Sequence, residues 1–215
     1  MSRHKNNKLN IALVSDPVGK TGTEILTKFI QILETLCDNL FVITGNFPEN
    51  RFSSEKIHIR NIKSYEKDRE SMIKAVPKFL IRELKILFSF IKIAKNVDIV
   101  ISRSWLLLMT ILAAKILRKR VVRIAEASLE EQSKLRYGSK SPFYYLAALG
   151  ERTGYVLSNQ IVSHATSNMM ELSRYKRKVI WGALFVDTAL FNVGKNLEQR
   201  PNMVGYIGNL SEVKG

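Results

Sequence analysis

The sequence predicts an α/β fold in which a parallel sheet is covered by helices. Short apolar runs of strand length alternate with longer segments of helical periodicity, a pattern typical of parallel strands joined by helical crossovers. Of the 215 residues, 46% are apolar, which is enough for a packed core and excludes wholesale disorder. Because such crossovers are right-handed, the helices should cover both faces of a doubly wound, Rossmann-like sheet.

The strands are predicted from apolar runs that end in polar or turn-forming residues. The run LNIALVS stops at Asp16 and Pro17, and the run IHIRNI alternates apolar and polar residues, as a half-exposed strand does. Strands are predicted at residues 9–15, 40–44, 57–62, 98–102, 121–124, 160–163, 178–181 and 203–207.

The helices are predicted from periodicity and from start signals. Thr21 and Glu24 have the spacing of a capping box, and Pro77 suits the first turn of a helix. The most apolar stretch, residues 105–117, is too short for the about 20 residues of a membrane-spanning helix and is predicted to be buried. Helices are predicted at residues 23–36, 77–95, 105–117, 142–157 and 168–175.

The organisation changes near the end of the chain. Residues 192–202 are polar, contain Gly194 and Pro201, and are predicted to form a linker. Residues 1–191 would then be one domain, and residues 203–215 the first strand and loop of a second, truncated one.

The charge of the chain points to an acidic partner. With 34 Lys and Arg against 19 Asp and Glu, the net charge is +15, which suits nucleic acid, an anionic membrane or a phosphorylated small molecule. No nucleic-acid-binding signature is present, so nucleic acid is disfavoured. The single Cys37 excludes an internal disulfide and a cysteine-cluster zinc site, and it fits a cytoplasmic protein.

The segment 77–95 combines a basic ridge with a broad apolar body. At about 100° per residue, Lys78, Arg82, Lys85 and Lys92 fall within one arc, and apolar side chains cover most of the remainder. Two interpretations stay open, a core helix with a solvated basic edge and a helix that lies in a membrane interface.

The loop after the first strand contains Gly19 and Gly22. Glycine permits a tight turn and close approach to a ligand, and the amides at the following helix start would face an anion. The loop matches no phosphate-binding fingerprint, since Val14 stands where a P-loop has glycine. An ordinary strand-to-helix turn is the alternative.

Polar residues follow several predicted strands at their carboxyl ends, where open parallel sheets bind ligands. Glu126 follows one strand, His164 follows another, and Ser102, Arg103 and Ser104 end a third. A carboxylate or imidazole there could take the proton of an acceptor hydroxyl. A polar residue satisfied by backbone or water is the alternative for each. No metal-ligand cluster is predicted.

The C-terminal stretch carries the most specific motifs. KVIWGALFVDTALFNV followed by MVGYIGNLSEVKG resembles the interdomain region of GT-B glycosyltransferases of the family-4 type. The residues that match the family's pattern are Gly182, Val186, Asp187, Thr188, Phe191, Gly208, Leu210, Lys214 and Gly215. Asn209 departs from it, since the family has arginine there, and no histidine matches the family's catalytic one.

The resemblance implies the first lobe of a GT-B fold, with the second lobe missing from this chain. It implies retaining transfer of a sugar from a UDP- or GDP-sugar to an acceptor, without a cofactor or metal. Glu126 or His164 would lie at the acceptor, Gly19 and Gly22 at the phosphate or acceptor loop, and Lys214 on the donor phosphate. A lipid-linked acceptor would place the protein on the inner face of an anionic membrane. The alternative is a non-catalytic, basic membrane-surface binding module on a degenerate Rossmann scaffold.

Overall fold

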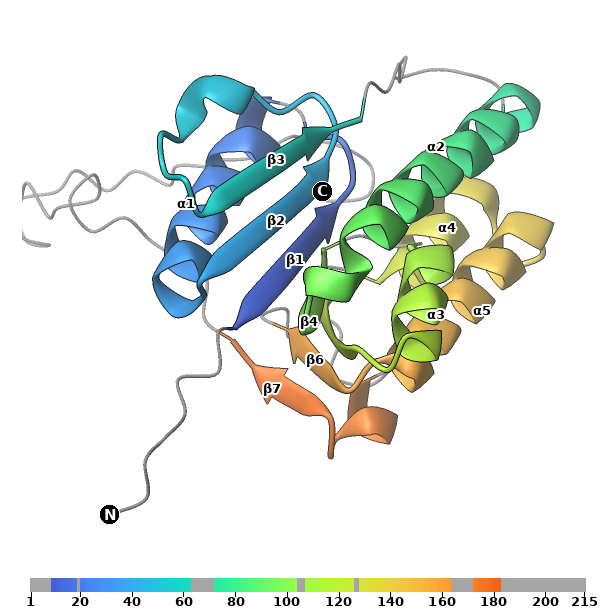
Figure 1. Ribbon diagram of the computed structural model, residues 1–215. Coiled ribbons are helices and arrows are strands. Elements are labelled where there is room, and N and C mark those ends of the chain that lie inside the picture. Colours follow the sequence, from blue (N-terminus) through green and yellow to red (C-terminus); the bar gives the residue numbers. More distant parts are fainter. Residues whose placement is uncertain are drawn as a thin grey trace, which may run out of the picture.

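The computed structural model describes residues 9–18, 20–62, 72–103, 107–125, 128–163 and 172–182 (Figure 1). These residues form a seven-stranded sheet in the order β3-β2-β1-β4-β5-β6-β7, and every neighbouring pair is parallel. The predicted α/β class with a Rossmann-like parallel sheet is confirmed. The strands are β1 (Asn10–Ser15), β2 (Asn39–Thr44), β3 (Ile57–Asn61), β4 (Ile99–Arg103), β5 (Arg120–Ala125), β6 (Gln160–Ser163) and β7 (Val179–Trp181).

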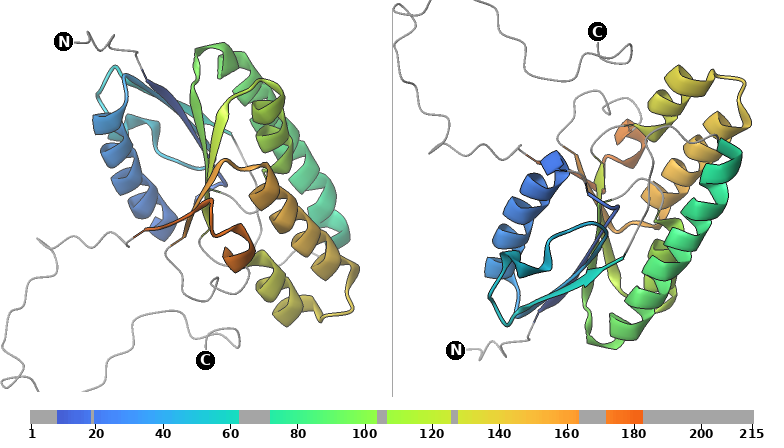
Figure 2. Two further views of the ribbon diagram at one scale, coloured as in Figure 1. Left: turned by 90° about the horizontal axis from the view of Figure 1, so that it is seen from below. Right: turned by 90° about the horizontal axis from the view of Figure 1, so that it is seen from above.

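The helices cover the two faces of the sheet unequally. Helix α1 lies on one face, whereas α2, α3, α4 and α5 lie on the other (Figure 2). Their bounds are α1 (Lys20–Leu36), α2 (Met72–Ile93), α3 (Leu108–Ile116), α4 (Leu129–Tyr137) and α5 (Pro142–Leu157), with short 3-10 turns at η1 (Glu49–Arg51), η2 (Ala94–Asn96) and η4 (Ser173–Tyr175). The chain is thus doubly wound about β1, because β2 and β3 extend the sheet on one side and β4 to β7 on the other.

Alternate residues of the central strand β1 supply the two cores. Ala12 and Val14 pack with α2 and α3, in a cluster that includes Phe90 and Ile111. Leu13 packs with α1 on the other face. This alternation follows from the period of two in a strand, and burial on both faces explains why β1 is wholly apolar between Asn10 and Ser15.

Three helix starts differ from the prediction, and one of them is that of α3, which begins at Leu108 rather than at residue 105. Helix α1 begins at Lys20, so Thr21 lies inside the helix and is not its N-cap, and the Glu24 carboxylate instead pairs with Arg51 at 2.6 Å. Helix α2 begins at Met72, so Pro77 lies inside it rather than in its first turn. A proline near the start of a helix removes only one backbone hydrogen bond, and the helix continues through it.

The structure adds a helix that periodicity does not predict. Helix α4 has a polar sequence, LEEQSKLRY, without an apolar stripe. It forms because Ser128 caps it, accepting a hydrogen bond from the Glu131 amide at 3.1 Å, and because it packs against α5. The remaining described strands agree with the prediction to within about two residues, the usual uncertainty of such boundaries.

None of the helices in the described residues combines the length and apolar character needed to span a membrane. The predicted strand 203–207, the linker 192–202 and most of the predicted helix 168–175 lie outside the described residues, so the proposed domain boundaries remain predictions.

Candidate functional site at the carboxyl edge of the sheet

The winding of the sheet reverses between β1 and β4, which makes this position the switch point of the sheet. Strands β1 and β4 pair in parallel from Ile11↔Ile99 to Ser15↔Arg103. Their crossovers leave in opposite directions, since α1 leads to β2 and α3 leads to β5. In open parallel sheets ligands bind at the carboxyl ends of the strands at this switch point. The residues that follow β1 and end β4 are therefore the first to consider.

The loop after β1 is held against the ends of β2 and β3. The Val18 amide donates to the Gly45 carbonyl at 2.9 Å, and the Thr44 hydroxyl donates to the Asp16 carbonyl at 3.0 Å. Gly45 has no room for a side chain, because an added Cβ would lie 2.6 Å from the Ile62 carbonyl oxygen and 2.9 Å from the Pro17 ring. The backbone of Asp16 is thereby fixed at the switch point.

Helix α2 brings two charged side chains to this loop. Arg82 Nη2 lies 3.3 Å from Asp16 Oδ1. The neighbouring Glu83 is only 2% exposed, and neither of its carboxylate oxygens has a hydrogen-bond partner among the described residues. The hydroxyl of Ser102, which lies next to the end of β4, is also buried without a hydrogen-bond partner in the described part of the chain. Burial of this kind is costly for a polar group and is often found at functional sites.

The environment of Glu83 keeps its carboxyl group protonated near neutral pH. Burial raises the pKa of Glu83 to about 8, the negative charge of Asp16 also raises it, and the positive charge of Arg82 opposes both. The switch point therefore combines a buried neutral carboxyl with the partly exposed ion pair of Asp16 and Arg82. This pair can accept from and donate to the hydroxyl groups of a polar ligand.

The strand ends that precede the two predicted catalytic residues are paired with each other. Ala125, the last residue of β5, is in register with Ser163, the last residue of β6, and the Ser163 hydroxyl donates to the Ala125 carbonyl at 3.2 Å. Glu126 and His164 follow these residues directly in the chain. Both lie outside the described residues, and their roles remain predictions.

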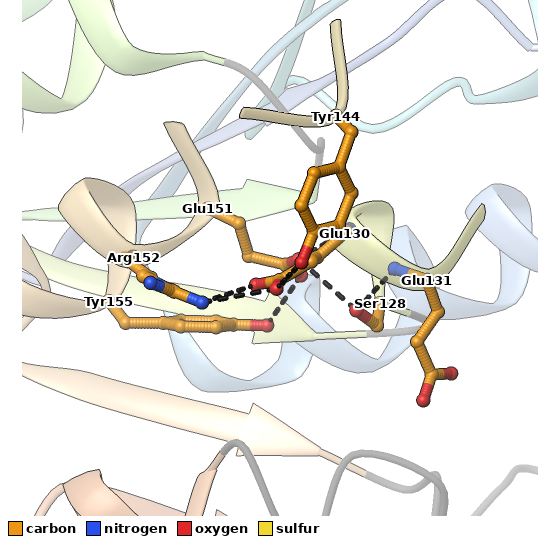
Figure 3. A network of polar contacts seen from close by, with 7 residues as sticks. All are labelled: Ser128, Glu130, Glu131, Tyr144, Glu151, Arg152 and Tyr155. Carbon is orange, nitrogen blue, oxygen red and sulfur yellow. Dashed lines mark hydrogen bonds and ion pairs between the residues drawn. The ribbon is translucent and has the colours of Figure 1, made fainter. Parts of the chain in front are cut away.

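The chain that follows Glu126 is anchored to α5 by a buried carboxylate (Figure 3). Glu151, 3% exposed, accepts hydrogen bonds from the Ser128 hydroxyl at 3.3 Å, the Glu130 amide at 3.0 Å and the Tyr155 hydroxyl at 2.8 Å. The Glu130 carboxylate accepts in turn from Tyr144 at 2.7 Å and pairs with Arg152 at 2.9 Å. The start of α4 is therefore fixed relative to α5.

A buried guanidinium adds to this anchor. Arg123 in β5 is 2% exposed, and its Cζ lies 4.9 Å from the centroid of the Tyr155 ring. Burial lowers the pKa of Arg123, whereas the charges of Tyr155 and Glu151 raise it. Gly154 leaves the space for this side chain, since a Cβ there would overlap Arg123 Nη1.

Replacing Ser128 with alanine is expected to destabilise the protein by about 1 kcal/mol, because α4 loses its N-cap and Glu151 loses one donor. Urea unfolding followed by circular dichroism measures this. Ser139→Ala, in the exposed turn between α4 and α5, is the matched control and should change stability by less than about 0.5 kcal/mol. Equal stability of the two variants would contradict a role for the cap.

The remaining predicted site residues are only partly placed. Gly22 lies in the first turn of α1, and an added Cβ there would meet Val18 at 3.4 Å, an ordinary contact. Gly19 and Lys214 lie outside the described residues. Local sequence patterns do not predict Glu83, Arg82 and Asp16 as a group. One signal was present, because Glu83 shares the buried face of α2 with Ile86 and Phe90 at spacings of three and seven residues.

Comparison with known proteins identifies the fold. No family model and no curated protein sequence matches the chain. Among solved structures, a UDP-glucose:anthocyanidin 3-O-glucosyltransferase in complex with UDP is similar with a TM-score of 0.59 and 13% identity, over 87% of this chain and 55% of that protein. LpCGTa in complex with UDP is similar with a TM-score of 0.57 and 10% identity, over 85% of this chain and 56% of that one.

A third similar structure has a different activity. A UDP-N-acetylglucosamine 2-epimerase aligns with a TM-score of 0.51 and 14% identity, over 81% of this chain and 48% of the epimerase. The chain spans about half the length of each of these three proteins. This likeness, together with the observed topology, shows that the chain has the Rossmann-like α/β fold of a GT-B lobe.

Proposed function

We propose that this chain is the N-terminal, acceptor-side lobe of a glycosyltransferase that moves a sugar from a nucleotide-sugar donor to an acceptor. The observation that carries the proposal is the set of residues at the carboxyl edge of the sheet. A buried polar cluster lies there at the switch point, and the last residues of β5 and β6, which directly precede Glu126 and His164 in the sequence, are in register with each other. Likeness in fold to UDP-bound glycosyltransferases and the resemblance of residues 182–215 to the family-4 type support it.

The proposed reaction is retaining transfer from a UDP- or GDP-sugar. The acceptor oxygen bonds to the anomeric carbon on the same face from which the nucleoside diphosphate leaves, so that the configuration is retained as the bond to the donor phosphate breaks. Glu126 or His164 holds the acceptor hydroxyl there and takes its proton. Lys214 and the backbone around Gly19 and Gly22 are proposed to stabilise the negative charge of the leaving diphosphate, without a metal. The second lobe would be encoded beyond Gly215.

The acceptor is proposed to be lipid-linked, with the protein peripheral on the inner, cytoplasmic face of a membrane. The charge of +15 supports this, and so do the apolar side chains that α2 exposes to solvent beside its lysines. The same observations support the alternative of a non-catalytic membrane-surface module. Transfer activity discriminates between them, because the module would bind membranes without releasing a nucleoside diphosphate.

The test is to express the complete reading frame that contains this chain and to incubate it with UDP-glucose, UDP-N-acetylglucosamine, UDP-galactose or GDP-mannose and a membrane extract. We expect release of UDP or GDP together with a labelled product. Glu126→Gln or His164→Ala, whichever is the base, should lower the rate about 100-fold.

Two outcomes would overturn the proposal. The first is no nucleoside diphosphate release with any donor. The second is conversion of UDP-N-acetylglucosamine into its 2-epimer, which would place the activity with the similar epimerase rather than with the transferases. The exposed Glu55→Gln variant is the control and should keep full activity.

A further inference from the structure

The outer side of helix α2 exposes apolar side chains in one continuous strip. Leu80 is 44% exposed, Ile81 52% and Phe88 60%. At about 100° per residue these residues lie together with Leu84 and Ile91 on one side of the helix, away from the buried face of Glu83, Ile86 and Phe90. Soluble monomers rarely expose apolar side chains in contiguous groups without a binding role.

The neighbouring helices extend this apolar surface. Helix α3 contacts α2, and α5 contacts α3, so that the three lie side by side on one face of the sheet (Figure 2). Ile116 of α3 is 72% exposed, and Leu149 of α5 is 64% exposed. We refer to the outer sides of α2, α3 and α5 as the outer helix face.

Positive charge borders the apolar strip of α2. Lys78, Lys85 and Lys92 are spaced seven residues apart and form a second strip beside it. Among the described residues from Pro77 to Lys119 there are only two acidic side chains. One is the buried Glu83, and the other is Asp98, which accepts a hydrogen bond from the Asn10 amide at the amino edge of the sheet.

The positive charge of the outer helix face indicates which kind of partner can bind to it. Two copies of a basic face would repel each other, so a second copy of the chain is disfavoured. An anionic bilayer offers both an apolar layer and negative head groups, and lysine side chains can lay their methylene groups along the apolar layer while the ammonium groups stay at the interface. Helix α1 on the opposite face also exposes apolar side chains, at Ile25, Ile32 and Leu36, but no basic strip borders them, because α1 carries the acidic residues Glu24 and Glu34.

We infer that the outer helix face binds the surface of an anionic membrane, with the apolar strip of α2 and Ile116 entering the head-group region and the lysines contacting anionic lipids. This deepens the membrane association proposed above, and it does not depend on the transfer chemistry. The sheet edge that carries the candidate site is left uncovered by this contact, because the contact uses the sides of the helices.

Sedimentation with lipid vesicles tests the inference. We expect the protein to bind vesicles of phosphatidylcholine and phosphatidylglycerol at least about tenfold more strongly than vesicles of phosphatidylcholine alone, and to lose most of this binding in concentrated salt. The double variant Lys85→Glu/Lys92→Glu should lose the preference for anionic lipid. The double variant Phe88→Ser/Ile116→Ser should bind both vesicle types at least about tenfold more weakly than wild type.

Matched controls come from outside the outer helix face. Leu36→Ser at the end of α1 replaces a side chain that is 61% exposed, and Lys56→Glu reverses an exposed charge before β3. Both should bind as wild type, and circular dichroism should confirm that every variant is folded.

The inference would be overturned if wild-type protein did not bind anionic vesicles, or if the outer-face variants bound them as strongly as the controls do. Dimerisation that the outer-face variants abolish would also overturn it, since the occupant would then be a second copy. Transfer to a water-soluble acceptor is measured separately, so that failure of membrane binding and failure of the proposed reaction are distinguishable.

Discussion

Replacing Gly45 with alanine is expected to destabilise the protein by about 3 kcal/mol. The added Cβ would lie 2.6 Å from the Ile62 carbonyl oxygen and 2.9 Å from the Pro17 ring, well inside contact distance. Neither neighbour can move freely, because the Ile62 amide donates to the Thr44 carbonyl at 2.7 Å and Pro17 lies in the loop that Val18 ties to Gly45. The strain would be relieved only by displacing the loop that carries Asp16.

Gly22→Ala is the matched control for this prediction. Gly22 lies in α1 close to the same loop, and its added Cβ would make an ordinary 3.4 Å contact with Val18. Because alanine favours a helix over glycine, this variant should be as stable as wild type or up to about 1 kcal/mol more stable. Urea unfolding followed by circular dichroism gives both values. If Gly45→Ala were as stable as Gly22→Ala, the loop after β1 would be able to move away from the added Cβ with little loss in the free energy of unfolding, and the prediction would be wrong.

Glu83→Gln is expected to remove a pH dependence of about 5 kcal/mol from the free energy of unfolding, because one pKa unit corresponds to about 1.4 kcal/mol. The pKa of Glu83 is raised from 4.5 to about 8 in the folded protein, chiefly by burial. The folded state therefore keeps a proton that the unfolded chain loses between these two values. The contribution of Glu83 to the free energy of unfolding is therefore greatest below pH 4.5 and is lost as the pH rises to about 8.

The measurement is the difference in unfolding free energy between Glu83→Gln and wild type at several pH values from 4 to 9. The difference should be small near pH 4, should grow in favour of the variant as the pH rises above about 4.5, and should level off above about pH 8. Using a difference cancels the titration of other groups, although Asp16 and Arg82 face Glu83 directly and belong to the same cluster. The exposed Glu55→Gln variant should give a flat difference. A flat difference for Glu83→Gln as well would mean that Glu83 is charged in the folded protein.

Periodicity predicted those elements whose ends coincide with strong local signals. Helix α5 and strand β6 begin and end where predicted, since Pro142 can start a helix and the apolar pair in β6 is bounded by the polar Gln160 and Ser163. Helix α4 was missed because a polar segment without an apolar stripe gives no periodic signal. The spacing of Ser128 and Glu131 was the available sign of its start.

The candidate site was harder to predict because its parts are distant in sequence. Strand-end positions such as Ser102 follow from topology and could be predicted. The pair of Asp16 with Arg82 could not, since Arg82 appeared as one more member of a basic ridge and only the crossover of α2 brings it to β1. The burial of Glu83 and the crowding at Gly45 likewise depend on packing between elements that local sequence does not record.

The ion pair between Asp16 and Arg82 has a mechanical consequence. Arg82 and Ile81 are adjacent in α2, yet one reaches the loop after β1 and the other faces solvent on the outer side. A helix with its side chains is about 10 Å across, so the two surfaces are separated by a single helix thickness. A tilt of α2 would therefore move Arg82 relative to Asp16, so that the ion pair couples the position of α2 to the loop after β1.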